Sequence, residues 1–198
     1  MKMKTLITLL AFTVLSLSVN AQLNPKDSTN MQNSKEYIRN LRDVDNNYTA
    51  YTEITINASA EIVRKHFLNF KKWPEWNTVI PKISVKSGDI NDLSTKPTLD
   101  LMLNFSRKKD PSPAPLHPNV FENTSEVFNW GVKKWLIKAE HVFIFESINN
   151  GKQTRLVHYE QMRGIMKSLV MSKKTKVKMV THYNTMNESF KIFCEENK

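Results

Sequence analysis

The strongest constraint on the fold is a series of strand-like segments that ends in one long amphipathic helix. Six segments have the alternating, β-branched or aromatic composition of strands, at residues 82–86, 98–105, 120–123, 126–130, 140–148 and 153–162. Strands that follow one another without intervening helices predict an antiparallel sheet. After them, apolar residues recur every three or four positions and predict one face of a terminal helix: Val180, Tyr183, Met186, Phe190 and Phe193.

The residues before this series predict one more strand and two short helices. Residues 49–56 alternate polar and apolar positions, as a strand does, and residues 60–70 repeat apolar positions at helical spacing. Trp76 lies in a second short helical segment between Pro74 and Pro81. We therefore expect an α+β fold. In it, a strongly bent antiparallel sheet of about seven strands grips the long C-terminal helix, with two short helices after the first strand.

The first 21 residues have the pattern of a secretory signal peptide. Lys2 and Lys4 precede an apolar run of about twelve residues, too short for a bilayer span of roughly twenty. The run ends in small residues before Ala21, where we expect cleavage. The sequence therefore predicts an exported protein, periplasmic or secreted, without a membrane anchor.

A compositional change separates the next segment from the folded domain. Residues 22–47 are rich in Asn, Lys, Asp and Ser and hold few apolar side chains. That composition is typical of a polar tether, so we expect at most one short helical turn in it. The regular apolar pattern begins at Tyr48, and we expect residues 48–198 to form a single domain.

The scarcity of glycine and cysteine excludes several classes of enzyme. The chain has four glycines, and the two nearest in sequence, Gly151 and Gly164, are too far apart for a dinucleotide fingerprint or a phosphate-binding loop. The single cysteine, Cys194, has no partner for a disulfide or a thiolate metal cluster. We therefore expect no cofactor.

The charge of the chain bears on its partners. The formal net charge is +10 at pH 7, and for an exported protein this favours anionic lipid headgroups or acidic ligands over nucleic acid. Five lysines cluster at the start of the final helix: Lys167, Lys173, Lys174, Lys176 and Lys178. This cluster is either a solvated helix face or a peripheral contact with an anionic membrane.

The last two strands can be aligned from their turn. Asn150-Gly151 between two alternating segments is a strong hairpin signal, because both central positions of the turn need positive φ. That turn pairs His141 with Glu160, Phe143 with His158, and Glu146 with Arg155 across the ladder. We place one face of this hairpin inward, with the side chains of His141, Phe143, Phe145, Leu156, His158 and Glu160.

The inward histidines and carboxylate form the one titratable cluster that the sequence suggests as a site. His158 and Glu160, with His141 nearby, could orient the polar end of a ligand or transfer a proton on a carbonyl compound, which makes His158 and Glu160 the catalytic candidates. The alternative is that they are a satisfied polar pair that fixes the register of the sheet. Two histidines and one glutamate could supply three metal ligands, but the zinc deaminase motif also needs a pair of cysteines, so we predict no metal site.

Four sequence blocks resemble the START-like superfamily called SRPBCC, which includes polyketide cyclase and dehydrase-like proteins, lipid-transport proteins and the major birch pollen allergen fold. They are Ile54–Val63, Trp76-Asn77, Phe128-Asn129-Trp130 and Thr154–Gly164, and the resemblance extends over about 48–196. It implies that the α+β fold expected above is a helix-grip fold, with a cavity between the sheet and the last helix. We expect the inward residues above to contact a ligand there, together with Trp76, Trp130, Tyr183 and Met186.

Three functions are compatible with the sequence. The leading one is an exported, noncatalytic binding protein for a hydrophobic or amphiphilic small molecule, because no nucleophile motif is present. The second is a polyketide cyclase or dehydratase-like enzyme that uses His158 or Glu160 as acid or base. The third is an envelope interaction module without a ligand. We expect a monomer or a weak dimer.

Overall fold

The computed structural model describes residues 25–42, 45, 47–104 and 111–198. The chain divides into two compact units, residues 1–48 and 49–198. Residues 1–21, where we expect the signal peptide, lie outside the described residues. None of the described helices is long and apolar enough to cross a membrane.

The first unit contains a helix where the sequence predicted a polar tether with at most one helical turn. Helix α2 (Pro25–Leu41) is 17 residues long. The low number of apolar residues guided the prediction, whereas their spacing is helical: Met31, Ile38 and Leu41 follow each other at seven and three positions. Spacing was therefore the better guide in this segment.

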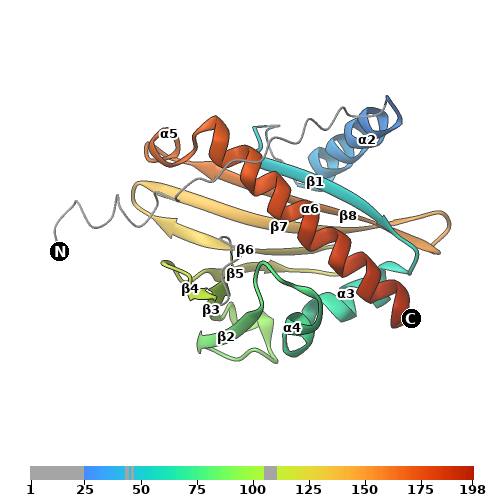
Figure 1. Ribbon diagram of the computed structural model, residues 1–198, viewed down its shortest axis with the longest axis horizontal. Helices are drawn as coiled ribbons and strands as arrows, with labels where there is room; N and C mark the ends of the chain where they lie inside the picture. The colour runs from blue at the N-terminus through green and yellow to red at the C-terminus, as the bar shows by residue number, and fades with distance from the viewer. Residues whose placement is uncertain (1–24, 43–44, 46, 105–110) are drawn as a thin grey trace. The chain divides into compact units, whose positions relative to one another are not determined.

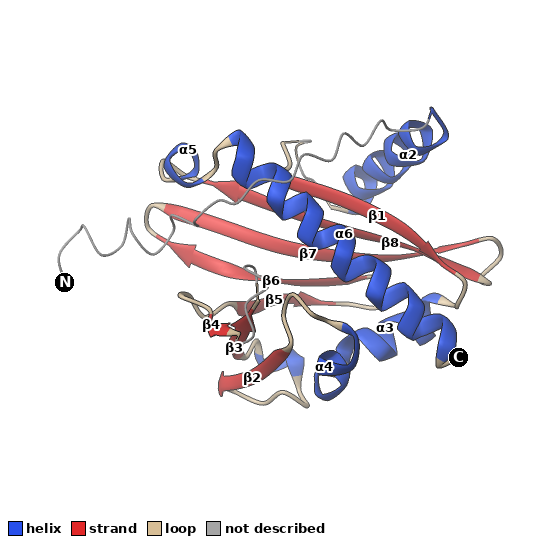
Figure 2. Cartoon of the chain, viewed as in Figure 1, coloured by secondary structure: helices blue, strands red, loops and turns tan. Residues whose placement is uncertain are grey.

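The second unit is built on one antiparallel sheet, shown in red in Figure 2. Its strands are β1 (Ala50–Ile56), β2 (Lys82–Ser87), β3 (Thr98–Leu103), β4 (Ser112–Pro113), β5 (Asn119–Asn123), β6 (Val127–Lys134), β7 (Ile137–Ile148) and β8 (Gln153–Arg163). The order across the sheet is β1-β8-β7-β6-β5-β3-β2, with β4 paired to β3 outside that path. The first strand therefore lies beside the last, and all seven predicted strands are present.

The helices of this unit are α3 (Ala60–Leu68), η1 (Phe70–Lys72), α4 (Trp73–Trp76), η2 (Leu93–Thr95), α5 (Lys167–Val170) and α6 (Lys173–Glu196). Ser59 caps α3, its hydroxyl oxygen accepting from the Ile62 N–H at 3.4 Å, and Ser172 caps α6 by accepting from the Thr175 N–H at 3.1 Å. The long helix α6 lies across one face of the sheet in Figure 1. This is the predicted helix-grip arrangement.

The register of the β7–β8 hairpin is the predicted one. His141 pairs with Glu160, Phe143 with His158, and Glu146 with Arg155. The turn has positive φ at Asn150 (53°) and Gly151 (80°), as the Asn-Gly signal requires.

The proline-rich segment that precedes β5 contributes the two-residue strand β4. Pro113 pairs with Met102 of β3, and the N–H of Ala114 donates to the carbonyl oxygen of Leu101 at 2.8 Å. A proline fits here because β4 is a short edge strand. Its outer edge has no neighbouring strand, so the missing N–H of proline leaves no hydrogen bond of the ladder unmade.

An aromatic core packs between the sheet and helices α3, α4 and α6. The ring of Phe67 lies 4.5 Å from that of Phe143 and 5.3 Å from that of Phe145, centroid to centroid. The ring centroids of Trp76 in α4 and Phe190 in α6 are 4.5 Å apart. Full burial of such side chains stabilises a fold by roughly 1.5–3 kcal/mol each. This core therefore fixes α6 against the sheet.

The buried side of α6 follows the predicted stripe in part. Its buried residues are Tyr183, Met186, Asn187, Phe190 and Cys194. Val180 and Phe193, which we placed in the stripe, are half-buried. The buried line instead includes Asn187, a polar residue that an apolar periodicity does not reveal.

Candidate functional site

A connected group of polar side chains lies at one end of the aromatic core. Strands β7 and β8 supply His141, His158 and Glu160, and α6 supplies Tyr183 and Asn187. The hairpin register brings the first three to one face, and α6 covers them. We call these five residues the polar cluster.

Glu160 and Tyr183 form one half of the polar cluster. The Tyr183 hydroxyl donates to the Glu160 carboxylate, with Oη 2.5 Å from Oε2. Glu160 is half-buried and Tyr183 is buried. A carboxylate in such a place needs a donor, because leaving it unpaired in an apolar environment costs several kcal/mol.

The other half is a chain of hydrogen bonds that starts at His141. The Nε2 atoms of His141 and His158 are bonded to each other, and Nδ1 of His158 lies 2.9 Å from Oδ1 of Asn187. The Asn187 amide donates to Oγ1 of Thr52 at 3.0 Å, and the Thr52 hydroxyl donates to the carbonyl oxygen of His158 at 3.0 Å. Thus β1, β8 and α6 are joined through side chains.

These bonds specify the tautomers of both histidines. Since the Asn187 oxygen accepts, Nδ1 of His158 carries the proton and its Nε2 is an acceptor. His141 must then donate from Nε2, which leaves its Nδ1 as the unprotonated nitrogen. The Nδ1 lone pair of His141 is therefore available to accept a hydrogen bond.

Ring stacking holds the same side chains in parallel planes. His158 stacks on Tyr183 at 4.1 Å and on Phe143 at 4.3 Å between centroids. His141 stacks on Tyr183 at 4.8 Å with an interplanar angle of 19°. Stacked aromatic faces thus lie next to the hydrogen-bonded edges of the polar cluster.

Burial keeps both histidines neutral. Desolvation lowers the pKa of His158 to about 3, although its hydrogen bond to Asn187 opposes that shift. Desolvation also lowers the pKa of His141 well below its ordinary value, and the neighbouring His158 lowers it further. At neutral pH, neither ring carries a charge.

Burial acts in the opposite direction on the two acids. It raises the pKa of Glu160 to about 7, although the hydrogen bond from Tyr183 lowers it. It also raises the pKa of Tyr183 well above the ordinary value, with the Glu160 charge adding to the effect. Glu160 is therefore the one member of the polar cluster that changes charge near neutral pH.

The structure divides the predicted ligand-contacting residues into two groups. His141, His158, Glu160 and Tyr183 come together in the polar cluster. The others belong to the packed aromatic and aliphatic core: Trp76, Trp130, Phe143, Phe145, Leu156 and Met186. Phe143 touches both groups, since its ring contacts Phe67 as well as His158.

Sequence reasoning missed Asn187 and Thr52. Thr52 occupies a polar position of the alternating strand β1 and pairs with His158 across the β1–β8 ladder. Asn187 lies four residues after Tyr183, on the same helical face. A polar residue in that position of an apolar stripe was the available signal.

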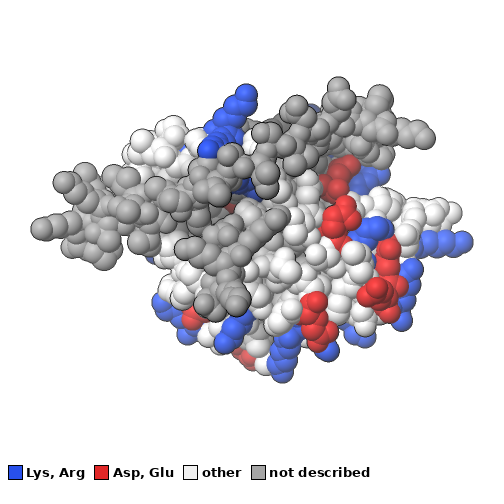
Figure 3. Space-filling view, viewed as in Figure 1, with Lys and Arg blue, Asp and Glu red and all other residues white. Residues whose placement is uncertain are grey.

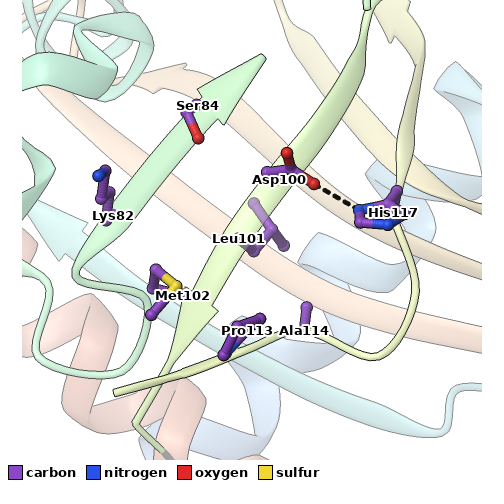
Figure 4. A pocket seen from close by; sticks show the side chains of 8 residues that line it. All are labelled: Lys82, Ser84, Asp100, Leu101, Met102, Pro113, Ala114 and His117. Carbon is purple, nitrogen blue, oxygen red and sulfur yellow. Dashed lines mark ion pairs between the residues drawn. The ribbon is translucent and has the colours of Figure 1, made fainter. Parts of the chain in front are cut away.

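A hollow of about 280 Å³ lies away from the polar cluster, on strands β2 to β4. Figure 4 shows the side chains around it, from Lys82, Ser84, Asp100, Leu101, Met102, Pro113, Ala114 and His117. Nδ1 of His117 forms an ion pair with Oδ1 of Asp100 at 2.5 Å, and both side chains are well exposed. The side chains around this hollow are both apolar, as at Leu101 and Met102, and polar, as at Lys82 and Ser84.

No three His, Cys, Asp or Glu side chains among the described residues are placed to hold one metal ion. Cys194 is buried, and burial raises the pKa of its thiol to about 12. The thiol is therefore protonated at neutral pH.

No family model matches this sequence, and no curated protein matches it. Solved structures do match the fold. A START superfamily protein from Mycobacterium smegmatis is 14% identical with a TM-score of 0.59, over 75% of this chain and 98% of that one. The Zhui aromatase/cyclase from Streptomyces sp. R1128 is 9% identical with a TM-score of 0.55, over 74% of this chain and 92% of that one.

A third match extends over more of the chain. The hypothetical protein jhp0584 from Helicobacter pylori is 12% identical with a TM-score of 0.55, over 91% of this chain and 99% of that one. At these identities the likeness concerns the fold. The curled antiparallel sheet, the two short helices after β1 and the long helix α6 are the parts that the sequence predicted. We conclude that the chain has a START-like, SRPBCC-type helix-grip fold.

Proposed function

We propose that the protein binds a hydrophobic or amphiphilic small molecule between the sheet and α6, with the ligand's polar end at Glu160, Tyr183 and His141. One observation carries the proposal. Glu160 is held on the inner face of the sheet beside aromatic rings, yet it keeps part of its surface exposed. A carboxyl group there can meet a ligand's hydroxyl or carbonyl group.

Two further features support this position. The unprotonated Nδ1 of His141 can accept a hydrogen bond, and His141 is also half-buried. The START-like fold is a hydrophobic ligand-binding fold, and one structure that matches it is an aromatase/cyclase. A ligand that is apolar along most of its length and polar at one end fits both features.

The test is competition for an apolar fluorescent probe, phenylnaphthylamine, by decanol and by decanoate. Above the pKa of Glu160, its carboxylate accepts hydrogen bonds but cannot donate them, so decanol should displace the probe more readily than decanoate does. Glu160→Gln supplies an amide donor and removes the charge. The preference for decanol should then fall by about tenfold, the scale of one mismatched buried polar group.

Glu140→Gln is the matched control, because Glu140 belongs to the same pair of strands but points to the other face of β7. Its variant should keep the wild-type preference. If the wild type binds no probe, or if both variants change the preference equally, the proposal is wrong. The remaining interpretation would then be an interaction module without a ligand.

A second candidate function rests on the pKa of Glu160, which at about 7 suits a general acid or base near neutral pH. Both ring nitrogens of His158 are engaged in hydrogen bonds and its side chain is fully buried. Of the two catalytic candidates, Glu160 is thus better placed to reach a substrate. A cyclase or dehydratase-like activity on a carbonyl or aromatic substrate would be lost in Glu160→Gln while phenylnaphthylamine binding persists.

Export is also a proposal. It is supported by Lys2 and Lys4, the apolar run and the small residues before Ala21. Cell fractionation with mass spectrometry of the N-terminus tests it. A mature chain that begins at Gln22 and lies outside the cytoplasm is the expected result, and an intact Met1 in the cytoplasm would contradict it.

A further inference from the structure

Two loops lie side by side at the end of the sheet where β6 turns into β7 and where β8 leads into α5. The N–H of Met166 donates to the carbonyl oxygen of Leu136 at 3.4 Å. Gly164 lies so close to the Leu136 carbonyl group that a Cβ atom at Gly164 would be 2.4 Å from the carbonyl oxygen. In Figure 1 the β6–β7 hairpin and α5 are neighbours at the left of the view.

Large apolar side chains project from both loops. Trp135, at the tip of the β6–β7 hairpin, is 91% exposed. Ile165 and Leu169, before and within α5, are each 73% exposed. Such exposure is costly in water, so an apolar group that recurs on adjacent loops indicates a contact surface. Tryptophan in particular favours the boundary between water and a bilayer.

Lysine surrounds these apolar side chains, and acidic residues are absent from the same two segments. Residues 131–138 and 164–180 contain eight lysines and no Asp or Glu. Lys133 and Lys134 on the hairpin, and Lys173 and Lys174 at the start of α6, are exposed. Elsewhere, as on the lower edge of the face in Figure 3, positive and negative side chains are mixed.

We propose that these two loops form a docking surface for the headgroup region of an anionic lipid bilayer. Trp135, Ile165 and Leu169 enter the interface, and the exposed side chains of Lys133, Lys134, Lys173 and Lys174 bind lipid phosphates. Charge complementarity favours this partner, since lysines near an anionic membrane are attracted to its headgroups and the two segments contain no Asp or Glu to oppose them. The strength of interfacial binding increases with the apolar area buried in the interface and with the attraction of basic side chains to anionic lipids, and the two loops offer both.

The docking surface and the polar cluster lie toward the same end of the β7–β8 ladder. His141 is four residues from the start of β7, roughly 13 Å along the strand. A bilayer held at the loops would therefore be close to the polar cluster. The docking proposal nevertheless stands independently of ligand binding, because it rests on different residues.

The experiment measures binding to vesicles of equal parts phosphatidylcholine and phosphatidylglycerol, with pure phosphatidylcholine as reference. All variants carry the same N-terminus, so any contribution from the residues before the domain cancels. Trp73, Trp76 and Trp130 are buried, which leaves Trp135 as the described tryptophan that can report contact with lipid. Its emission should shift to shorter wavelength and be quenched by brominated lipid, and Trp135→Ala should lose both effects.

Lys133→Glu combined with Lys134→Glu tests the charge. We expect more than about tenfold weaker binding, because two favourable lysines become repulsive. The matched control is Lys65→Glu with Lys71→Glu, which changes the net charge equally at exposed positions of α3 and η1. Binding of the control should stay within about twofold of the wild type. Ile192→Ser, an exposed apolar position near the end of α6, is the control for Ile165→Ser with Leu169→Ser.

Three results would overturn the proposal. The first is absence of binding to the anionic vesicles, which would make the lysines a solvated face. The second is equal binding to both kinds of vesicle, or equal losses in the Lys133/Lys134 and Lys65/Lys71 variants. The third is vesicle binding without any change in Trp135 emission, which would place the contact elsewhere on the protein.

Discussion

The side chain of Asn187 on α6 accepts a hydrogen bond from His158 on β8, with Nδ1 of His158 2.9 Å from the amide oxygen. Both residues are buried. Because the amide nitrogen of Asn187 also donates to Thr52 of β1, one helical residue connects two strands. This connection sets the tautomer of His158 and, through it, the direction of the hydrogen bond from His141.

Asn187→Ala should destabilise the fold by about 1–3 kcal/mol, because it leaves buried polar atoms of His158 and Thr52 without their partners. The measurement is the free energy of unfolding in urea. Asn184→Ala is the control, since Asn184 is exposed on the same helix and should change that energy by less than about 0.5 kcal/mol. Equal effects of the two substitutions would show that the Asn187 connection contributes nothing.

Stability should depend on pH through Glu160. Its pKa rises from 4.5 to about 7 on folding, so the folded state binds the proton more tightly than the unfolded state does. The resulting stability is present below pH 4.5 and is lost as the pH rises through 7. Relative to Glu160→Gln, the wild type should lose about 2–3 kcal/mol of unfolding free energy over that interval.

This comparison also separates Glu160 from the histidines. The pKa values of His141 and His158 are lowered on folding, so their contribution to the free energy of unfolding is lost as the pH falls below 6.5, opposite to that of Glu160. Both histidines are present in the wild type and in Glu160→Gln, so their contribution cancels in the comparison. A difference between the two proteins that does not vary with pH would contradict the shifted pKa of Glu160.

Phe190→Ala should cost about 3–5 kcal/mol, the range for removing a large aromatic side chain from a packed core. Phe190 is 1% exposed and contacts Trp76 and Phe67. Ile192→Ala, at a 55% exposed position of the same helix, should have little effect on thermal unfolding. A Phe190 variant as stable as the Ile192 variant would show that α6 is not held by the aromatic core.

Gly164→Ala should disturb the two loops of the docking surface. Gly164 has φ of 101°, and an added Cβ would approach the Leu136 carbonyl oxygen to 2.4 Å. Gly151→Ala separates the two causes, because φ is +80° there but no atom lies within 4 Å of the added Cβ. We expect the melting temperature to fall further in the Gly164 variant, since only that variant combines backbone strain with a steric clash. Equal falls would mean that the loops are not in close contact.

Much of the second unit could be predicted because short-range signals specify it. Asn150-Gly151 set the hairpin register, and that register placed His141 opposite Glu160 on the inner face. Alternation along the strands and the stripe at Tyr183, Met186 and Phe190 specified the sheet and its helix. Each of these signals is carried by neighbouring residues in the sequence.

The remainder depends on contacts between distant segments. The hydrogen bond between Asn187 and His158 forms only at the angle at which α6 crosses β8. The periodicity of apolar residues in the sequence does not predict that angle. The sequence did not show that Phe67 of α3 would fill the space beside Phe143, so we expected Phe143 to face a ligand more than a core. Trp135 is exposed because strand β6 continues to Lys134, whereas we predicted that this strand ends at residue 130. The longer strand places Trp135 at the tip of the β6–β7 hairpin.

Native mass spectrometry of the protein purified from its own host tests the central claim most directly. We predict an added mass that corresponds to a hydrophobic or amphiphilic molecule, removed by organic solvent and reduced in Glu160→Gln but not in Glu140→Gln. A bare chain mass under conditions that preserve other protein–lipid complexes, together with no binding of phenylnaphthylamine, would contradict the proposal that this fold holds a ligand between its sheet and α6.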